Sequence, residues 1–285
     1  MNTELTIGAI NPGYGGLPIG VAAALGGGTL AWHAHPSQPF DYAGRMLMRY
    51  HHPCAGAHTI IDAPPPMVDV LTVNGYDDWT FTGTSLIDAG YKPPLVIVET
   101  ESRRSAAVPV CGYLRSRGYR AAWQTTRASD VGAPHRRPRV YVIAARKDCE
   151  APTVDTAYLD ADRCVGRMWP TPELNDPSLI KTAYQWVAGE VVGHPDKALT
   201  RALEQWEKVT GEHYPHPLYT IPTPETMGRL SLGFMEWMMG LPVGYVSTPP
   251  LDLASAERRH LLQTGTVPLQ AAHAVAVGLT RMGEP

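Results

Sequence analysis

The chain has 285 residues, of which 44% are hydrophobic and 18% are charged, and this balance excludes an intrinsically disordered protein. No run approaches the roughly 18 consecutive apolar residues of a membrane span, and the start of the chain lacks the basic region of a secretory signal, so we expect a cytoplasmic protein. The net charge of −3 excludes a protein held on nucleic acid by its overall charge, but not one with a local basic cleft.

Short apolar segments alternate with amphipathic ones along the chain. The apolar segments predict strands at 5–10, 29–34, 68–73, 95–99, 120–125 and 139–145. Helical periodicity predicts helices at 17–25, 42–50, 106–118, 196–209, 230–240 and 268–280. Because alternating strands and helices favour parallel pairing, we expect an α/β fold with a doubly wound, mostly parallel sheet.

The composition changes near residue 150. Residues 151–225 are rich in Pro, Trp, Tyr and His and contain one clear helical stretch, which predicts a small, loop-rich lobe. Helical periodicity then returns. We therefore expect a core at 1–150, a lobe at 151–225 and a C-terminal segment at 226–285 that returns to the core.

The cysteines are widely spaced and form no Cys-x-x-Cys pair: Cys54, Cys111, Cys149 and Cys164. This spacing is typical of reduced, unpaired thiols, and we expect no metal site. Three arginine groups could line a local basic cleft: Arg103-Arg104, Arg115/Arg117/Arg120 and Arg136-Arg137-x-Arg139. Solvated surface arginines are an equally good interpretation of the second group.

A glycine-rich turn, Asn11-Pro12-Gly13-Tyr14-Gly15-Gly16, joins the first predicted strand to the first predicted helix. Such a turn presents backbone N–H groups at a helix N-terminus, where they can hold an anionic or polar ligand. Glycine is also needed for close strand–helix packing alone, so both interpretations stay open. The second strand ends at His33-Ala34-His35 without a carboxylate for ribose hydroxyls, and Asp41 is the nearest candidate.

Five segments, in order, resemble the motifs of the DNA cytosine-5 methyltransferases. These are 11–17 (Phe-x-Gly-x-Gly-Gly-Leu in the family), 97–101 (Leu-Glu-Asn-Val), 135–143 (Gln-Arg-Arg-x-Arg-Val-Tyr-Val-Ile), 230–242 (phage and actinobacterial members) and 265–272 (Gly-x-Val-x-Pro-x-Gln-Ala-Ala). The resemblance spans nearly the whole chain. It implies the S-adenosylmethionine-dependent methyltransferase fold, in which a core and a small target-recognition lobe face each other across a DNA cleft.

The resemblance also implies roles for particular residues. The cofactor S-adenosylmethionine would be held by the residues that match its site: Asn11, Pro12, Gly13, Tyr14, Gly15, Gly16, Thr264 and Thr266. In active relatives a cysteine thiolate adds to C6 of a flipped-out cytosine in double-stranded DNA, so that C5 attacks the methyl group. Glu99 matches the glutamate at the ring edge, and Arg137 and Arg139 match the pair that holds the base and the catalytic loop.

The chain departs from the family at the reactive centre. Asp77 and Asp78 stand where the family has Pro-Cys, so the nucleophile is replaced by Asp78. Only about 20 residues separate Asp78 from Glu99, which is short for the mobile loop that closes over the base. Thr100 replaces the Asn of Glu-Asn-Val, and Gln263-Thr264 replaces a Gly-Asn near the methionine end of the cofactor.

Three hypotheses follow from this combination. The first is a catalytically degenerate member that binds DNA or cofactor, or serves as the partner subunit of an active methyltransferase. The second is an enzyme of altered chemistry on a pyrimidine base in DNA, in which Asp77 or Asp78 and Glu99 act as acid–base groups. The third is ordinary cytosine-5 methylation by another route.

Overall fold

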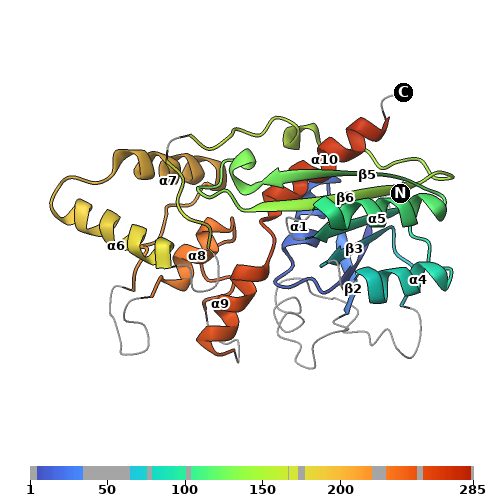
Figure 1. Cartoon of the computed structure of the whole chain (residues 1–285), viewed down its shortest axis with the longest axis horizontal. Coiled ribbons are helices and arrows are strands. Elements are labelled where there is room, and N and C mark those ends of the chain that lie inside the picture. The colour runs from blue at the N-terminus through green and yellow to red at the C-terminus, as the bar shows by residue number, and fades with distance from the viewer. Residues whose placement is uncertain are drawn as a thin grey trace. The chain divides into compact units, whose positions relative to one another are not determined.

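The structure is a computed structural model of the whole chain, and it describes residues 5–34, 65–75, 79–100, 104–165, 167–172, 177–219, 229–248 and 253–283. The chain divides into two compact units (Figure 1). The first unit comprises Met1–Thr126, Pro138–Asp160 and Pro268–Pro285, and the second comprises Arg127–Arg137 and Ala161–Val267. None of the helices in the described ranges is long and apolar enough to cross a membrane.

The first unit is built on a six-stranded sheet with the strand order β2-β1-β3-β4-β6-β5. The strands are β1 Thr6–Ile10, β2 Thr29–Ala34, β3 Val70–Asn74, β4 Leu95–Thr100, β5 Tyr119–Arg127 and β6 Pro138–Arg146. β1 pairs in parallel with β2 and β3, and β3 pairs in parallel with β4, whereas β6 is antiparallel to β4. The predicted α/β fold with a mostly parallel sheet is confirmed.

Helices cover both faces of this sheet, which is therefore doubly wound (Figure 1). On one face lie α1 Gly16–Ala24, the short η3 Thr156–Tyr158 and α10 Pro268–Gly283. On the other lie the π-helix η1 Trp79–Gly83, α4 Thr84–Asp88 and α5 Arg104–Ser116. α1 and α10 approach closely at Gly20, where a Cβ would stand only 2.7 Å from the Cβ of Ala271. The predicted helix at 42–50 lies outside the described residues.

The second unit is more helical than its composition predicts. Its elements are η2 Ala128–Val131, α6 Pro177–Val191, α7 Lys197–Thr210, α8 Leu232–Met238 and α9 Ser255–Thr264. Asp196 caps α7 by accepting hydrogen bonds from the amides of Ala198 and Leu199. Ring contacts join Trp169 to Phe234 and Tyr214 to Trp237 on α8, and Trp186 contacts both Trp169 and Tyr214, so the segment with α8 packs with the lobe.

This packing explains why the observed units differ from the expected division at residues 150 and 225. The indole N–H of Trp206 on α7 donates to the carbonyl of Trp237 on α8 over 2.7 Å. The segment at 226–285 is consequently divided, because residues up to Val267 belong to the second unit and α10 belongs to the first. Residues 127–137, expected in the core, also belong to the second unit.

A fully buried carboxylate organises the turn after α8. Glu236 accepts hydrogen bonds from the amides of Gly244, at 2.9 Å, Val246 and Ser247, and from the hydroxyl of Ser247 at 2.8 Å. A buried carboxylate is costly unless its oxygens are satisfied, and these four donors satisfy both oxygens. The Glu236 side chain is thus used inside the fold of the second unit.

Candidate functional site

A chain of polar contacts runs along the carboxyl edge of the parallel strands in the first unit. Asn11, just after β1, donates its side-chain N–H to the carbonyl of Asn74 at the end of β3 over 3.4 Å. Asn74 donates its own side-chain N–H to Oε2 of Glu99, near the end of β4, over 2.8 Å. Open α/β sheets place their ligand crevices outside this edge, so these residues mark the candidate site.

Arg139 completes this network. Because β6 is antiparallel to β4, with Glu99 opposite Tyr141, the start of β6 lies beside the end of β4. The Nε of Arg139 forms an ion pair with Oε1 of Glu99 at 2.5 Å. The two side chains are 13% and 5% exposed, which makes this a largely buried pair. Both oxygens of the Glu99 carboxylate are therefore engaged, one by Asn74 and one by Arg139.

The glycine turn lies at the same edge, between β1 and α1. Asn11, Gly13 and Gly15 all have positive φ values, 50°, 58° and 93°, and the Gly15 amide donates to the carbonyl of Pro12 over 2.9 Å. Among the described residues, no side chain caps α1 and no atom lies within 4 Å of where a Cβ on Gly13 would stand. With respect to the described residues, the backbone at Gly13 is therefore open near the N-terminus of α1, where a ligand could approach it.

Pro12, Tyr14, Gly15 and Gly16 are buried, and Tyr14 is among the core residues of the unit. Tyr14 thus supports the turn from within. The expected second partner of a nucleotide, Asp41, lies outside the described residues.

Asp77 and Asp78 also lie outside the described residues, but both flanks of their segment are defined. The Gly75 amide donates to the backbone carbonyl of Glu99 over 2.9 Å, so β3 leads into the segment directly beside Glu99. On the other side, the Trp79 amide donates to the carbonyl of Gly75 over 3.2 Å, and the Trp79 side chain is buried in the core.

Comparison with known proteins bears on this edge of the sheet. Residues 98–198 match the model of a family described as C-5 cytosine-specific DNA methylase. The chain therefore resembles the cytosine-5 DNA methylases, as its motifs predict. The matched segment contains Glu99, Arg137 and Arg139. No match was found among curated protein sequences.

Solved structures of methyltransferases share the fold. The S. pombe Dnmt2 methyltransferase is 11% identical with a TM-score of 0.58, over 99% of this chain and 100% of that one. The Entamoeba histolytica methyltransferase EhMeth is 11% identical with a TM-score of 0.56, over 99% and 100% of the two chains. A variant of Spodoptera frugiperda DNMT2 is 12% identical with a TM-score of 0.55, over 97% and 100%. At these identities the likeness concerns the fold alone, an α/β fold that this chain shares with these methyltransferases.

The remaining predicted site residues of this methylase-like chain lie in its second unit. Arg137 is buried, and its guanidinium donates to the carbonyls of Leu262, at 3.4 Å, and Gln263 at the end of α9. Thr264 is exposed and donates its hydroxyl to the carbonyl of His260, whereas Thr266 is buried. In this structure Arg137 therefore binds backbone carbonyls of its own unit.

Sequence reasoning missed Asn74. It is a polar residue at the end of an apolar strand, next to the Gly75 that begins the loop with Asp77 and Asp78. That position was a usable signal, since polar side chains at the carboxyl ends of neighbouring parallel strands meet at one edge of the sheet. What the sequence could not supply was the contact between Asn74 and Glu99.

Proposed function

We propose that the protein is a catalytically degenerate relative of the cytosine-5 DNA methyltransferases, which binds duplex DNA and a pyrimidine base without methylating it. The observation that carries this proposal is that Glu99 forms an ion pair with Arg139, while the segment after β3 contains no cysteine. Glu99 keeps its ion pair with Arg139, while the positions that match Pro-Cys are Asp77 and Asp78.

The replacement of the nucleophile removes the first chemical step. A carboxylate, with an ordinary pKa near ~4, is a hard and weak nucleophile toward an aromatic carbon, whereas a thiolate is intrinsically strong. Asp78 therefore does not add to C6 of a pyrimidine. Its suitable roles are those of a hydrogen-bond acceptor or a base.

The described cysteines offer no substitute thiolate. Cys111 lies on α5 within the core, and burial raises the pKa of its thiol. Cys149 follows the far end of β6, where it accepts a hydrogen bond from Arg146 over 2.9 Å. Cys164 belongs to the second unit, and burial raises the pKa of its thiol to about 11. Cys54 lies outside the described residues.

The Glu99 carboxylate and its partners are nevertheless suited to binding a base. Arg139 and Asn74 hold the Glu99 carboxylate in one orientation at the ligand edge of the sheet. In that orientation the carboxylate can accept a hydrogen bond from the amino edge of a pyrimidine, with Arg139 as its counter-ion. The base would have to leave the duplex to reach this edge.

The glycine turn fits S-adenosylmethionine as far as its described residues allow. The open space at Gly13 and the uncapped N-terminus of α1 suit the polar methionine part of the cofactor. Gly13 would hold that part through its backbone groups, because the amides of Asn11 and Gly15 already donate to the carbonyls of Ala34 and Pro12. When bound, the cofactor would supply an electrophilic methyl group. In a degenerate member it would serve as a structural ligand, and an active methyltransferase subunit would be the partner.

The deciding experiment combines chemistry with binding. Purified protein is incubated with S-adenosylmethionine and mixed-sequence duplex DNA, and the DNA is digested to nucleosides for mass spectrometry. We expect unchanged nucleosides together with measurable duplex binding by fluorescence anisotropy. Glu99→Gln should weaken binding to a duplex with one unpaired cytosine, while Glu190→Gln, the same change at an exposed position on α6, should not. Appearance of 5-methylcytosine would refute the proposal.

One observation favours altered chemistry as the second candidate. Asp77 and Asp78 follow closely after Asn74 in the sequence, and the amide of Asn74 contacts Glu99. A base heavier than cytosine or thymine, but not 5-methylcytosine, would support this candidate. Asp78→Asn would then abolish the modification, whereas it would leave the binding of a degenerate member intact.

A further inference from the structure

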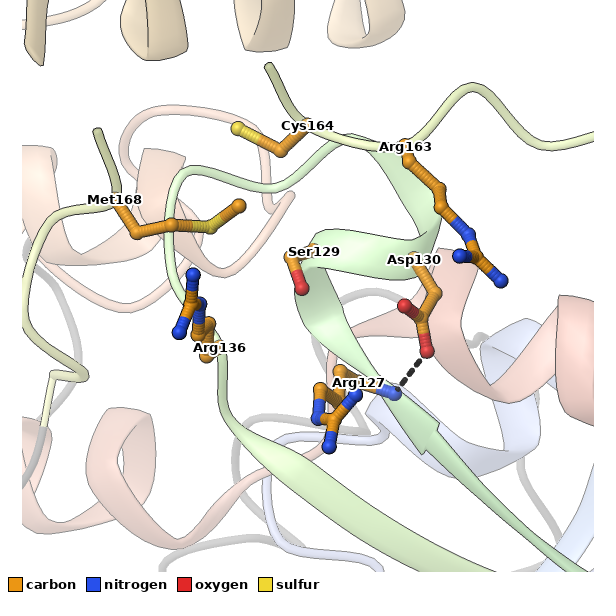
Figure 2. Close-up of a pocket in the computed structure, with 7 residues that line it drawn as sticks. All are labelled: Arg127, Ser129, Asp130, Arg136, Arg163, Cys164 and Met168. Carbon is orange, nitrogen blue, oxygen red and sulfur yellow. Dashed lines mark hydrogen bonds between the residues drawn. The ribbon is translucent and has the colours of Figure 1, made fainter. Parts of the chain in front are cut away.

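A pocket of about 410 Å³ opens in the second unit, apart from the network around Glu99. Figure 2 shows Ser129 between Arg136 and Asp130, with the Arg163 side chain on the far side of Asp130. Its lining consists of Arg127, Ser129, Asp130, Arg136, Arg163, Cys164 and Met168. A neighbouring pocket of about 440 Å³ shares Arg136 and Met168 with it.

The backbone holds the lining segments together. The short helix η2 follows Arg127, whose amide donates to the carboxylate of Asp130 over 2.8 Å. The Cys164 amide donates to the carbonyl of Ser129 over 2.8 Å, which fixes the residue before it, Arg163, beside η2. The pocket is therefore built by hydrogen bonds that do not use the arginine side chains.

A third segment is attached in the same way. The Trp169 amide donates to the carbonyl of Pro134 over 2.8 Å, and His135 and Trp169 form a β-bridge. These bonds keep Met168 close to Arg136. Ser129 and Cys164 are buried at the base of the pocket, while the three arginines are exposed.

The arginines of this pocket have no carboxylate partner among the described residues. In the described part of the chain, Arg127, Arg136 and Arg163 form no ion pair, and the one acidic residue in the lining is Asp130. Arg167, by contrast, pairs with Asp196 at 3.0 Å. Guanidinium groups stay charged at all physiological pH values, so the pocket has an excess of positive charge on a chain of net charge −3.

The chemistry of the lining selects the ligand. Several guanidinium groups and one hydroxyl offer many donors and one acceptor site, an arrangement that matches the oxygens of a phosphate group. Among the described residues no aromatic ring lines this pocket, so they offer no stacking surface for a base. A single phosphodiester is the ligand that satisfies both features.

We propose that the pocket of Arg127, Arg136 and Arg163 binds a backbone phosphate of duplex DNA. This inference rests on the proposed function, because it takes DNA as the partner. Such a contact would fix the position of the protein on the duplex without contacting a base, and it would not depend on the DNA sequence.

The test is duplex binding by fluorescence anisotropy as a function of salt concentration. Arg136→Gln and Arg163→Gln should each weaken binding about tenfold at low salt, and their double variant should reduce the slope of log K against log salt by about one. Arg201→Gln, the same change at an exposed position on α7 outside the pocket, is the matched control. Equal losses of DNA affinity in all variants, the control included, would show a diffuse effect of charge and refute the proposal that this pocket binds a phosphate.

Further arms separate this inference from the proposed function. If the wild-type protein binds duplex DNA and the pocket variants bind it equally well, the pocket inference fails and the proposed function stands. If the wild-type protein does not bind duplex DNA, both fail. Titration with inorganic phosphate identifies the source, because phosphate binding that is lost in Arg136→Gln, with unchanged DNA binding, would assign the pocket to a free anion and overturn the DNA assignment.

Discussion

The ion pair between Glu99 and Arg139 yields the sharpest prediction, because its energetic role follows from burial. Arg139→Gln removes the counter-ion and leaves a carboxylate that is only 5% exposed at its side chain. Glu99→Gln removes the carboxylate and leaves a guanidinium that is 13% exposed. The double variant has two neutral amides in place of the pair.

The magnitude follows from what each variant leaves behind. Removing one partner of a buried ion pair costs about 3–5 kcal/mol. The lower end applies to Arg139→Gln, about 3 kcal/mol, because Asn74 still donates to the other oxygen over 2.8 Å. Glu99→Gln should cost about 2 kcal/mol, since water reaches part of the guanidinium. The double variant should lose only about 1–2 kcal/mol, because no charge is then buried alone.

A double-mutant cycle by urea unfolding measures this coupling, which we expect at about 3–4 kcal/mol from the losses above. The control cycle uses Arg117 and Asp88, an exposed pair at 2.6 Å with side chains 40% and 51% exposed. That pair should show a much smaller coupling, because water screens the charges of an exposed ion pair. Additive losses at Glu99 and Arg139, within about 0.5 kcal/mol, would contradict the assignment of a buried, coupled pair.

Three further predictions concern packing and buried groups. Gly20→Ala should destabilise the protein by about 1–3 kcal/mol, because the new methyl group would clash between α1 and α10. Gly112→Ala, at an exposed position on α5, should instead stabilise the protein by about 0.5–1 kcal/mol. Thermal unfolding of the two variants measures both effects. Glu236→Gln should cost about 3 kcal/mol, since an NH₂ group would face backbone N–H donors, and a loss below about 1 kcal/mol in urea unfolding would be inconsistent with the four observed bonds. Burial raises the pKa of the Cys164 thiol to about 11, so little thiolate is present at pH 8. The rate of its alkylation by iodoacetamide at pH 8 should therefore be about a hundredfold lower than that of free cysteine, and the rate should increase with pH up to about 11. Peptide mass spectrometry measures this rate.

The elements that the sequence predicted well are those with uninterrupted apolar runs. The strand expected at 29–34 is β2, and the helix expected at 268–280 is α10, which continues to Gly283. Helices α6 and α9 were not expected. α9 contains two arginines and a histidine in its middle, which interrupt its apolar stripe, so its formation depends on packing within the second unit. α6, by contrast, carries an apolar stripe at Leu179, Ala183 and Trp186, so the sequence did contain a usable signal for this helix.

The candidate site shows the same division between local and tertiary information. Glu99 could be predicted because it ends an apolar strand and matches a family motif, and Arg139 because of the Arg-x-Arg pattern. The different surroundings of Arg137 could not be predicted, since they depend on where α9 ends relative to residues 127–137. The arginine pocket could not be predicted either, because its side chains come from two segments that are separated by more than two dozen residues in the sequence.

The two charged features of this protein differ in what they imply about binding. The Glu99–Arg139 pair has a structural reason to be present, since each partner satisfies the other at the edge of the sheet. The pocket of Arg127, Arg136 and Arg163 has none within the described residues, because three like charges with a single carboxylate, Asp130, in the same lining leave an excess of positive charge that destabilises the unit. Neutral glutamines at these three positions should therefore stabilise the protein slightly while weakening its hold on DNA. A variant that loses stability and DNA affinity together would point instead to a structural role for the arginines.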